Sequence, residues 1–296
     1  MFDFIAKPLG QFLYFLYLYF DNYGIALITF TLIIKLALLP LMIKQSHSAS
    51  KISTLQPQLQ EIQKLYKDDK EKLQQETAKI YHENKANPLG GCLPSLIQLP
   101  VLFSLFYVIT QPLKFMLSKT PEQIEKIIKI IPDSMRNIQY IQINALNYIN
   151  EHIDILSQLG GVIKESELIN LNFLGLNLSW VPKLDFNLLS GPQAGQYIAL
   201  ALMPLIGAAA IFISTKLSMK QNTVNQGSKL TQNYMLFVGP LMTLIVSFQM
   251  PAGVILYWIV GYLFQIPQQI YINKYIHKHN VRVSAVGNES AAQRAS

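Results

Sequence analysis

Five apolar runs of about 20 residues constrain the fold of this chain more than any other feature of its sequence. A helix of about 20 residues rises about 30 Å, the thickness of the hydrocarbon core of a bilayer. Charged residues make up 14% of the chain, against about 25% in typical soluble domains. We predict an all-α polytopic membrane protein with five transmembrane helices, at residues 23–43, 93–111, 196–216, 231–249 and 252–272.

The segments between these runs complete the expected organisation. Residues 1–22 have an apolar part too short to span and rich in Phe and Tyr, which is typical of an amphipathic helix in the membrane interface. The alternative, that this part begins the first span, stays open. Residues 44–92 repeat apolar positions at intervals of three and four around Asp68-Asp69-Lys70, which predicts a cytosolic helical hairpin. The remaining predicted segments are an extracytoplasmic loop (112–195), a cytosolic loop (217–230) and a cytosolic basic tail (273–296).

The distribution of lysine and arginine orients the spans. The segment from Lys44 to Lys85 has eight lysines and six acidic residues, and the segment from Lys216 to Lys229 has three lysines and no acid. After residue 273, four basic residues stand against one acid. Basic segments next to spans stay in the cytosol, so we predict an outer N-terminus and a cytosolic C-terminus. An odd number of spans agrees with this orientation.

The long loop carries one clear helix signal. Thr120-Pro121-Glu122-Gln123 is a capping box with proline in the first turn, which predicts a helix through about Ile131. A second helix is expected from Ser134 to Leu159, before Gly160-Gly161. We expect this loop to cap the outer ends of the spans and to hold no chemistry.

Catalytic and metal-binding patterns are missing from the sequence. The five histidines have no zinc spacing, and no nucleophile elbow, Walker loop or dinucleotide glycine pattern is present. A single cysteine, Cys92, excludes an intrachain disulfide and a cysteine metal cluster. We therefore expect no enzyme activity, no metal and no cofactor. A Ser/Lys hydrolase through Ser104 or Ser214 is a weaker alternative, because both hydroxyls also suit helix packing.

Lys35 lies inside the first apolar run with no acidic neighbour. An isolated charge at the centre of a bilayer costs about 2.5 to 3.5 kcal/mol even on the lenient insertion scale. Lys44, at the end of the run, is roughly 13 Å away at 1.5 Å per residue, so the Lys35 side chain cannot reach the interface. We expect Lys35 to face water or a partner. A channel or solute transporter is the rival class, but the spans contain no Asp or Glu for a proton relay.

Two motifs resemble those of a known family. NPLGGCLP at 87–94 with LIQLP at 96–100, and MPAGVILYW at 250–258 with Gln268-Gln269 behind it, resemble the signatures of the YidC insertases of the YidC/Oxa/Alb superfamily. The resemblance covers essentially residues 20–275. It implies a membrane protein insertase and chaperone whose five-helix core holds a hydrophilic groove, open to the cytosol and to lipid. Among the members of this family, the Gram-positive type fits best. It lies in the plasma membrane and has no large extra outer domain.

The resemblance also implies site residues and partners. In the family, a cation of the first core span faces the groove; Lys35 sits there, where most relatives carry arginine. The other groove residues that it implies are Gln98, Ser214 or Thr215, and Trp258 with Tyr257 beside it. A hydrogen bond between helices is an equally good interpretation of Gln98, and an interfacial anchor is one of Trp258. The resemblance implies nascent membrane proteins as partners, with the ribosome and the Sec translocon as further candidates. Separately, the lysines of the hairpin predict a landing surface for anionic lipids or a ribosome, and a solvated helical face is an equally good interpretation. We expect the insertase to work as a monomer.

Overall fold

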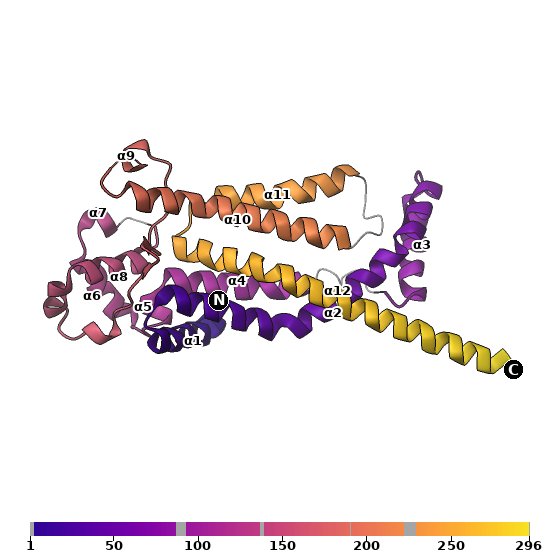
Figure 1. Ribbon diagram of the computed structural model, residues 1–296, viewed down its shortest axis with the longest axis horizontal. Coiled ribbons are helices and arrows are strands. Elements are labelled where there is room, and N and C mark those ends of the chain that lie inside the picture. Colours follow the sequence, from indigo (N-terminus) through magenta and orange to yellow (C-terminus); the bar gives the residue numbers. More distant parts are fainter. Residues whose placement is uncertain (1–2, 87–92, 137–138, 190, 222–228, 296) are drawn as a thin grey trace. The chain divides into compact units, whose positions relative to one another are not determined.

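The computed structural model describes residues 3–86, 93–136, 139–189, 191–221 and 229–295 (Figure 1). These residues are mostly helical, and they divide into two compact units. The first unit contains Met1–Lys35, Ile97–Phe212 and Val238–Tyr262, and the second contains Leu36–Leu96, Ile213–Phe237 and Leu263–Ser296. Several long helices begin in one unit and end in the other.

Helices cover all five of the predicted spans. They are α2 (Tyr23–Leu65), α4 (Leu93–Thr110), α10 (Ala194–Gln221), α11 (Lys229–Ser247) and α12 (Ala252–Ala295). Within the described residues, two stretches are long and apolar enough to cross a membrane, Tyr23–Ile52 and Ala194–Ser218, and the apolar parts of α4 and α11 are shorter. These features are those of an all-α membrane protein, whereas the count of five spans stays a prediction.

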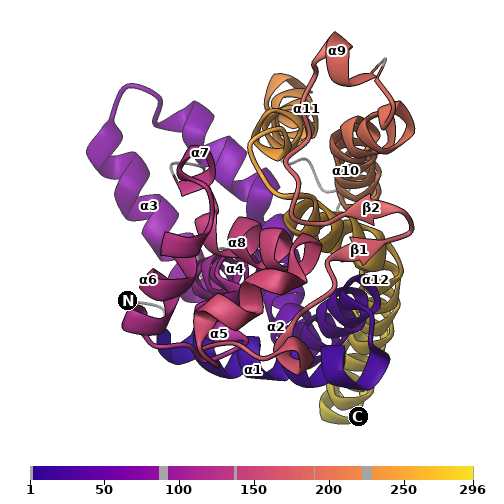
Figure 2. The ribbon, with the colours of Figure 1, turned by 90° about the vertical axis from the view of Figure 1, so that its left-hand side faces the viewer.

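The N-terminal helix α1 (Asp3–Phe20) is attached to the chain that follows α4. It lies beside α5 (Pro112–Phe115), as Figure 2 shows. The Gln11 amide donates to the carbonyl oxygens of Phe115 and Met116, at 3.1 and 2.8 Å. A Cβ atom at Gly10 would overlap the backbone of Phe115, so this close approach requires glycine. Other α1 side chains remain exposed and apolar, as an interfacial helix would need: Phe4, Phe15, Leu18 and Tyr19.

The loop after α5 is largely helical. Its first helix, α6 (Pro121–Ile130), begins with the predicted capping box, in which Thr120 and Gln123 satisfy each other's backbone N–H groups. The capping-box prediction is therefore confirmed. The rest of the loop consists of α7 (Asp133–Arg136), α8 (Ile141–Glu151), the 3-10 helices η2 (Ile153–Leu159) and η3 (Glu165–Glu167), a hairpin of β1 (Asn172–Phe173) and β2 (Leu176–Asn177), and α9 (Phe186–Leu189).

The single helix predicted from Ser134 to Leu159 is wrong. Tyr140 adopts a left-handed conformation with φ of 65°, which no helix interior accommodates, and His152 separates α8 from η2 at φ of −135°. Tyr140 has a tertiary reason for this conformation, because its hydroxyl donates to the carbonyl oxygen of Gln249 at 2.8 Å. A contact more than 100 residues away in the chain overrides the local helical pattern.

The same loop also fixes the start of α12. The N–H groups of Ala252 and Gly253 donate to the carbonyl oxygens of Trp180 and Leu178, at 2.8 and 2.9 Å. The first N–H groups of a helix have no partner within it, so these bonds act as a cap supplied from elsewhere in the chain. The loop thereby sets where α12 begins, and so positions the side chains that line the site described below.

The second unit contains the predicted hairpin region. The C-terminal part of α2 packs through Leu55 and Leu59 against Ala86. Ile80 and Tyr81 of α3 (Lys70–Glu83) pack around this contact. Asp69 caps α3 by accepting a hydrogen bond from the N–H of Lys72 at 3.0 Å. The first helix of this region is continuous with the first predicted span, since α2 passes through residue 44 without a break.

Candidate functional site

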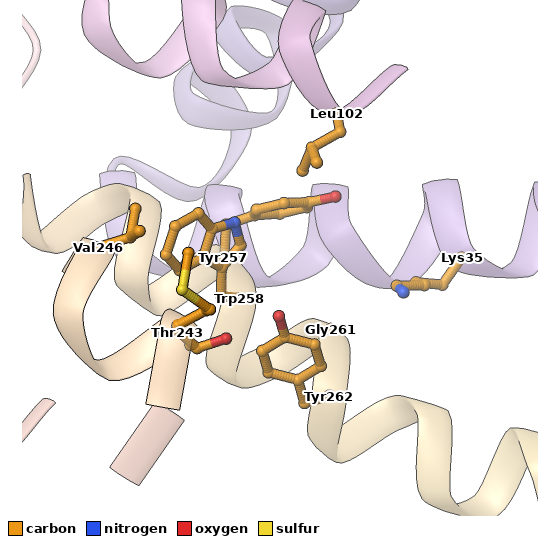
Figure 3. A pocket seen from close by; sticks show the side chains of 9 residues that line it. Lys35, Leu102, Thr243, Val246, Tyr257, Trp258, Gly261 and Tyr262 are labelled. Carbon is orange, nitrogen blue, oxygen red and sulfur yellow. The ribbon is translucent and has the colours of Figure 1, made fainter. Parts of the chain in front are cut away.

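Lys35 lines a pocket of about 340 Å³ in the first unit, which we call the lysine pocket (Figure 3). Four helices contribute to it: α2, α4, α11 and α12. The other lining residues are Leu102, Met242, Thr243, Val246, Tyr257, Trp258, Gly261 and Tyr262. Hydroxyl groups of Thr243, Tyr257 and Tyr262 thus share a pocket with one cation, and none of the nine lining residues is acidic.

Gly261 makes room for the lysine side chain. A Cβ atom at position 261 would lie 3.4 Å from Lys35 Cε and 3.7 Å from Nζ, so the helix α12 backbone passes directly beside the charged end. Lys35 is partly exposed, and within the described part of the chain it forms no ion pair or hydrogen bond. Its charge is therefore not neutralised by a residue of the described chain.

A second pocket, which we call the aromatic pocket, adjoins the first. It has a volume of about 240 Å³ and shares Leu102, Tyr257 and Trp258 with the lysine pocket. Its other lining residues are apolar or aromatic: Phe103, Phe106, Tyr107, Ile109, Met250 and Val254. Tyr257 and Trp258 therefore border both a polar, cationic space and an apolar one.

The structure brings together three of the residues that the resemblance implied, namely Lys35, Tyr257 and Trp258. Gln98 lies on α4, but its side chain is outside the described residues, as is the whole of the 87–92 part of the first motif. Ser214, which is buried, and Thr215 belong to the part of α10 that lies in the other unit. They are not among the residues that line the lysine pocket.

Sequence reasoning missed the other six lining residues, which are Leu102, Met242, Thr243, Val246, Gly261 and Tyr262. A signal for the last two was present, since Gly261 and Tyr262 follow Trp258 by about one helical turn. Thr243 had a weaker signal as an isolated hydroxyl in an apolar run. Ser247, one turn later, donates its own hydroxyl to the backbone oxygen of Thr243 at 2.6 Å.

The arrangement suits binding rather than covalent chemistry. Ser104 is fully buried on α4 and is not a lining residue of the lysine pocket, so a Ser104–Lys35 dyad has no support in the geometry. The described residues also contain no group of three or more His, Cys, Asp or Glu side chains that could hold a metal ion. What the pocket offers is a positive charge beside hydroxyl groups and an apolar surface.

Most of the chain is similar in sequence to proteins of one family. The family described as 60Kd inner membrane protein matches residues 15–279. The membrane protein insertase YidC of Clostridium perfringens (strain 13 / Type A) is 30% identical over 254 residues, covering 85% of this chain and 78% of that protein. Membrane protein insertase YidC 2 of Bacillus anthracis is 30% identical over 275 residues, covering 91% of this chain and 80% of that protein.

Other relatives are much longer than this chain. The membrane protein insertase YidC of Chloroherpeton thalassium (strain ATCC 35110 / GB-78) is 30% identical over 277 residues, which is 92% of this chain but 37% of that protein. The family match over residues 15–279 includes all nine residues that line the lysine pocket. The chain belongs to the YidC family of 60Kd inner membrane proteins.

Proposed function

We propose that this protein is a membrane protein insertase that helps other proteins to enter and fold in the bilayer, with the two adjoining pockets as its substrate groove. The observation that carries the proposal is the unpaired charge of Lys35 in a pocket formed by four helices of a YidC-family chain. Such a charge is costly in a membrane, and no described residue pairs with it. This favours a transient partner from outside the chain, namely a substrate.

The charge acts on the polar tail of the substrate. A tail with acidic residues is attracted to Lys35, and this attraction is stronger in a pocket of low dielectric constant than in water. The hydroxyls of Thr243, Tyr257 and Tyr262 replace part of the hydration that the tail loses. Lysine keeps the charge that arginine supplies in most relatives, but it lacks the planar fork that binds a carboxylate through two bonds. Attraction, rather than bidentate capture, is therefore the role of Lys35.

The aromatic pocket acts on the apolar segment that follows the tail. Its lining of Phe, Tyr and Met side chains is as apolar as lipid, so a hydrophobic helix loses little when it passes from this surface into the bilayer. Burial of that helix in lipid supplies the driving force, and no nucleotide is required. Gln98 on α4 would extend the polar lining as the family resemblance implies.

The topology and partners of the insertase follow from the sequence. Five spans with an outer N-terminus and a cytosolic C-terminus in the plasma membrane place the hairpin and the basic tail in the cytosol. Nascent membrane proteins are the substrates, delivered by the ribosome alone or together with the Sec translocon, while lysines of the hairpin meet anionic lipids. The protein needs no cofactor for this work.

The test uses the purified full chain in liposomes with a small single-span substrate whose tail becomes protected from protease when it crosses the bilayer. A photocrosslinking residue at Met242, which lines the same pocket, reports contact with the tail and leaves Lys35 in place. We expect protection together with crosslinks. Protection without crosslinks from position 242 would contradict the role of the lysine pocket, whereas leakage of a small dye without protection would favour a channel.

A further inference from the structure

A third pocket continues the row formed by the first two. This glutamine pocket has a volume of about 420 Å³ and is lined by Phe106, Thr110, Gln111, Gln139, Tyr140, Ile141 and Gln142. It shares Phe106 with the aromatic pocket, which in turn shares Leu102 with the lysine pocket. All three pockets lie in the first unit, along one wall of α4 from Leu102 to residue 111, a length of roughly 13 Å at 1.5 Å per residue.

The character of the lining changes in order along this row. The lysine pocket has a cation and hydroxyls, the aromatic pocket is almost wholly apolar, and the glutamine pocket has three carboxamides with no charged side chain. A carboxamide offers the donors and the acceptor of a peptide group. The hydrogen-bonding groups of this pocket therefore suit a polypeptide backbone better than an ion.

Hydrogen-bonding capacity is left over in the glutamine pocket. Gln142 Oε1 accepts from the N–H of Lys114 at 3.1 Å, which leaves its NH₂ group for another partner. Gln139 Nε2 donates to Tyr140 at 2.8 Å, which leaves its oxygen. The Gln111 side chain forms no hydrogen bond within the described part of the chain. An extended chain in this pocket would find both donors and acceptors.

Tyr140 lines the glutamine pocket and contacts two residues that line the aromatic pocket, Phe106 and Met250. Its ring meets Phe106 edge-on, with centroids 6.0 Å apart, and its hydroxyl lies 2.8 Å from the carbonyl oxygen of Gln249 and 3.3 Å from Met250 Sδ. The backbone of Tyr140 is left-handed, which is unfavourable for a bulky residue and is retained where the surroundings impose it. The hydrogen bond to the backbone oxygen of Gln249 and the ring contact with Phe106 thus help to hold Tyr140 in place.

We propose that the glutamine pocket is a second subsite for substrate, which receives the extended backbone of the polar tail after the lysine pocket, and that Tyr140 is the barrier displaced when the tail arrives. This assignment rests on the proposed insertase function. It gives the tail a route along α4 that ends among the loop residues 139–142. Tyr140 is a positioning residue in this scheme, since it controls passage through its hydrogen bond to the carbonyl oxygen of Gln249.

The first arm of the test places a photocrosslinking residue at Gln111 of the full chain in liposomes, with a single-span substrate that carries a short polar tail. The control places the same residue at Gln158, an exposed position of η2 in the same loop. We expect tail crosslinks from position 111 that appear later than those from Met242 in the lysine pocket, and none from position 158. A protected tail that crosslinks to position 242 but never to position 111 would overturn the subsite and leave the insertase intact.

The second arm removes the hydroxyl of the barrier. Tyr140→Phe keeps the ring against Phe106 and loses the bond to Gln249, which should raise the rate of tail protection about fivefold, the factor that corresponds to a net hydrogen bond of about 1 kcal/mol. Tyr148→Phe is the control, because Tyr148 lies on α8, the helix that begins directly after Tyr140, and stacks on His152. An unchanged or slower rate for Tyr140→Phe would overturn the barrier. No protection by the unsubstituted protein would overturn the insertase itself.

Discussion

Two lysines of the first unit, Lys35 and Lys119, differ in whether an acidic residue of the described chain neutralises their charge. Lys119, whose side chain is 10% exposed, forms two bonds with Glu167, at 2.8 and 2.9 Å. Lys35 lies in its pocket with no acidic residue in the lining. A buried cation that is paired with a carboxylate helps to hold the loop together. A cation without such a partner can still attract an acidic group of a ligand. The contrast separates a structural lysine from a candidate functional one.

The Lys119–Glu167 pair joins parts of the loop that are distant in sequence. Lys119 precedes α6, and Glu167 ends η3 while accepting a further bond from the N–H of Lys164 at 2.8 Å. Lys114 and Asp3 form a comparable but more exposed link, at 2.7 Å, between α5 and α1. These pairs hold the loop in the position from which it caps α12. They therefore support the lysine pocket indirectly.

The largest expected effect comes from reversing the unpaired charge. Lys35→Glu should abolish insertion of a substrate with an acidic tail while leaving the thermal midpoint of the detergent-solubilised protein unchanged, because no ion pair is broken. Lys35→Arg should preserve insertion. Protease protection in liposomes measures activity, and circular dichroism measures unfolding. Equal activity of the Glu and Arg variants would contradict the charge model.

Removing the partner of the other lysine should act on stability instead. Glu167→Gln leaves Lys119 without its carboxylate and should lower the free energy of unfolding by about 1 to 2 kcal/mol. Glu125→Gln is the matched control, because the Glu125–Lys129 pair is 65% and 69% exposed and is worth at most about 0.5 kcal/mol. Insertion measured well below the thermal midpoint should not change. A loss of insertion without loss of stability would erase the distinction between the two lysines.

A smaller effect is expected from filling the space beside Lys35. Gly261→Ala places a methyl group in van der Waals contact with Lys35 Cε, 3.4 Å away, which leaves the lysine side chain fewer conformations at a cost of up to about 0.5 kcal/mol. Insertion should slow by up to about twofold. Gly207→Ala is the control, because its methyl group would meet Ile259 at 3.7 Å and no charge. The measurement is the insertion rate of each variant in liposomes. Equal rates for the two variants would contradict a role of Gly261 in the site.

The smallest effect is the dependence of stability on acid. Burial raises the pKa of Glu167, but hydrogen bonds from Lys119 and the Lys164 N–H lower it by more, so its pKa lies below the ordinary 4.5. The stabilisation by the pair is therefore complete above about pH 4.5 and is lost as the pH falls through the folded-state pKa. Thermal midpoints of the unsubstituted protein should fall over this range more steeply than those of Glu167→Gln. Parallel curves would contradict the assignment.

Local sequence determined much of the helical framework. The length of the apolar runs predicted where α2, α4, α10, α11 and α12 would form, since a backbone in lipid must satisfy its hydrogen bonds within a helix. The capping box at Thr120 predicted the start of α6, because its bonds join residues three apart. Lys35 also stood out without any structure, as a cation that its neighbours in the chain could not neutralise.

Tertiary structure decided what surrounds these elements. No local pattern indicated that Tyr140 would interrupt a helix, because its partner, the carbonyl oxygen of Gln249, is 109 residues away. Nor could spacing show that Thr243 and Gly261 would share a pocket with Lys35, since that depends on how three helices pack. Periodicity and composition report which residues favour a helix and which favour lipid. Which side chains meet across helices is set by packing, whose contacts join residues that no local window contains.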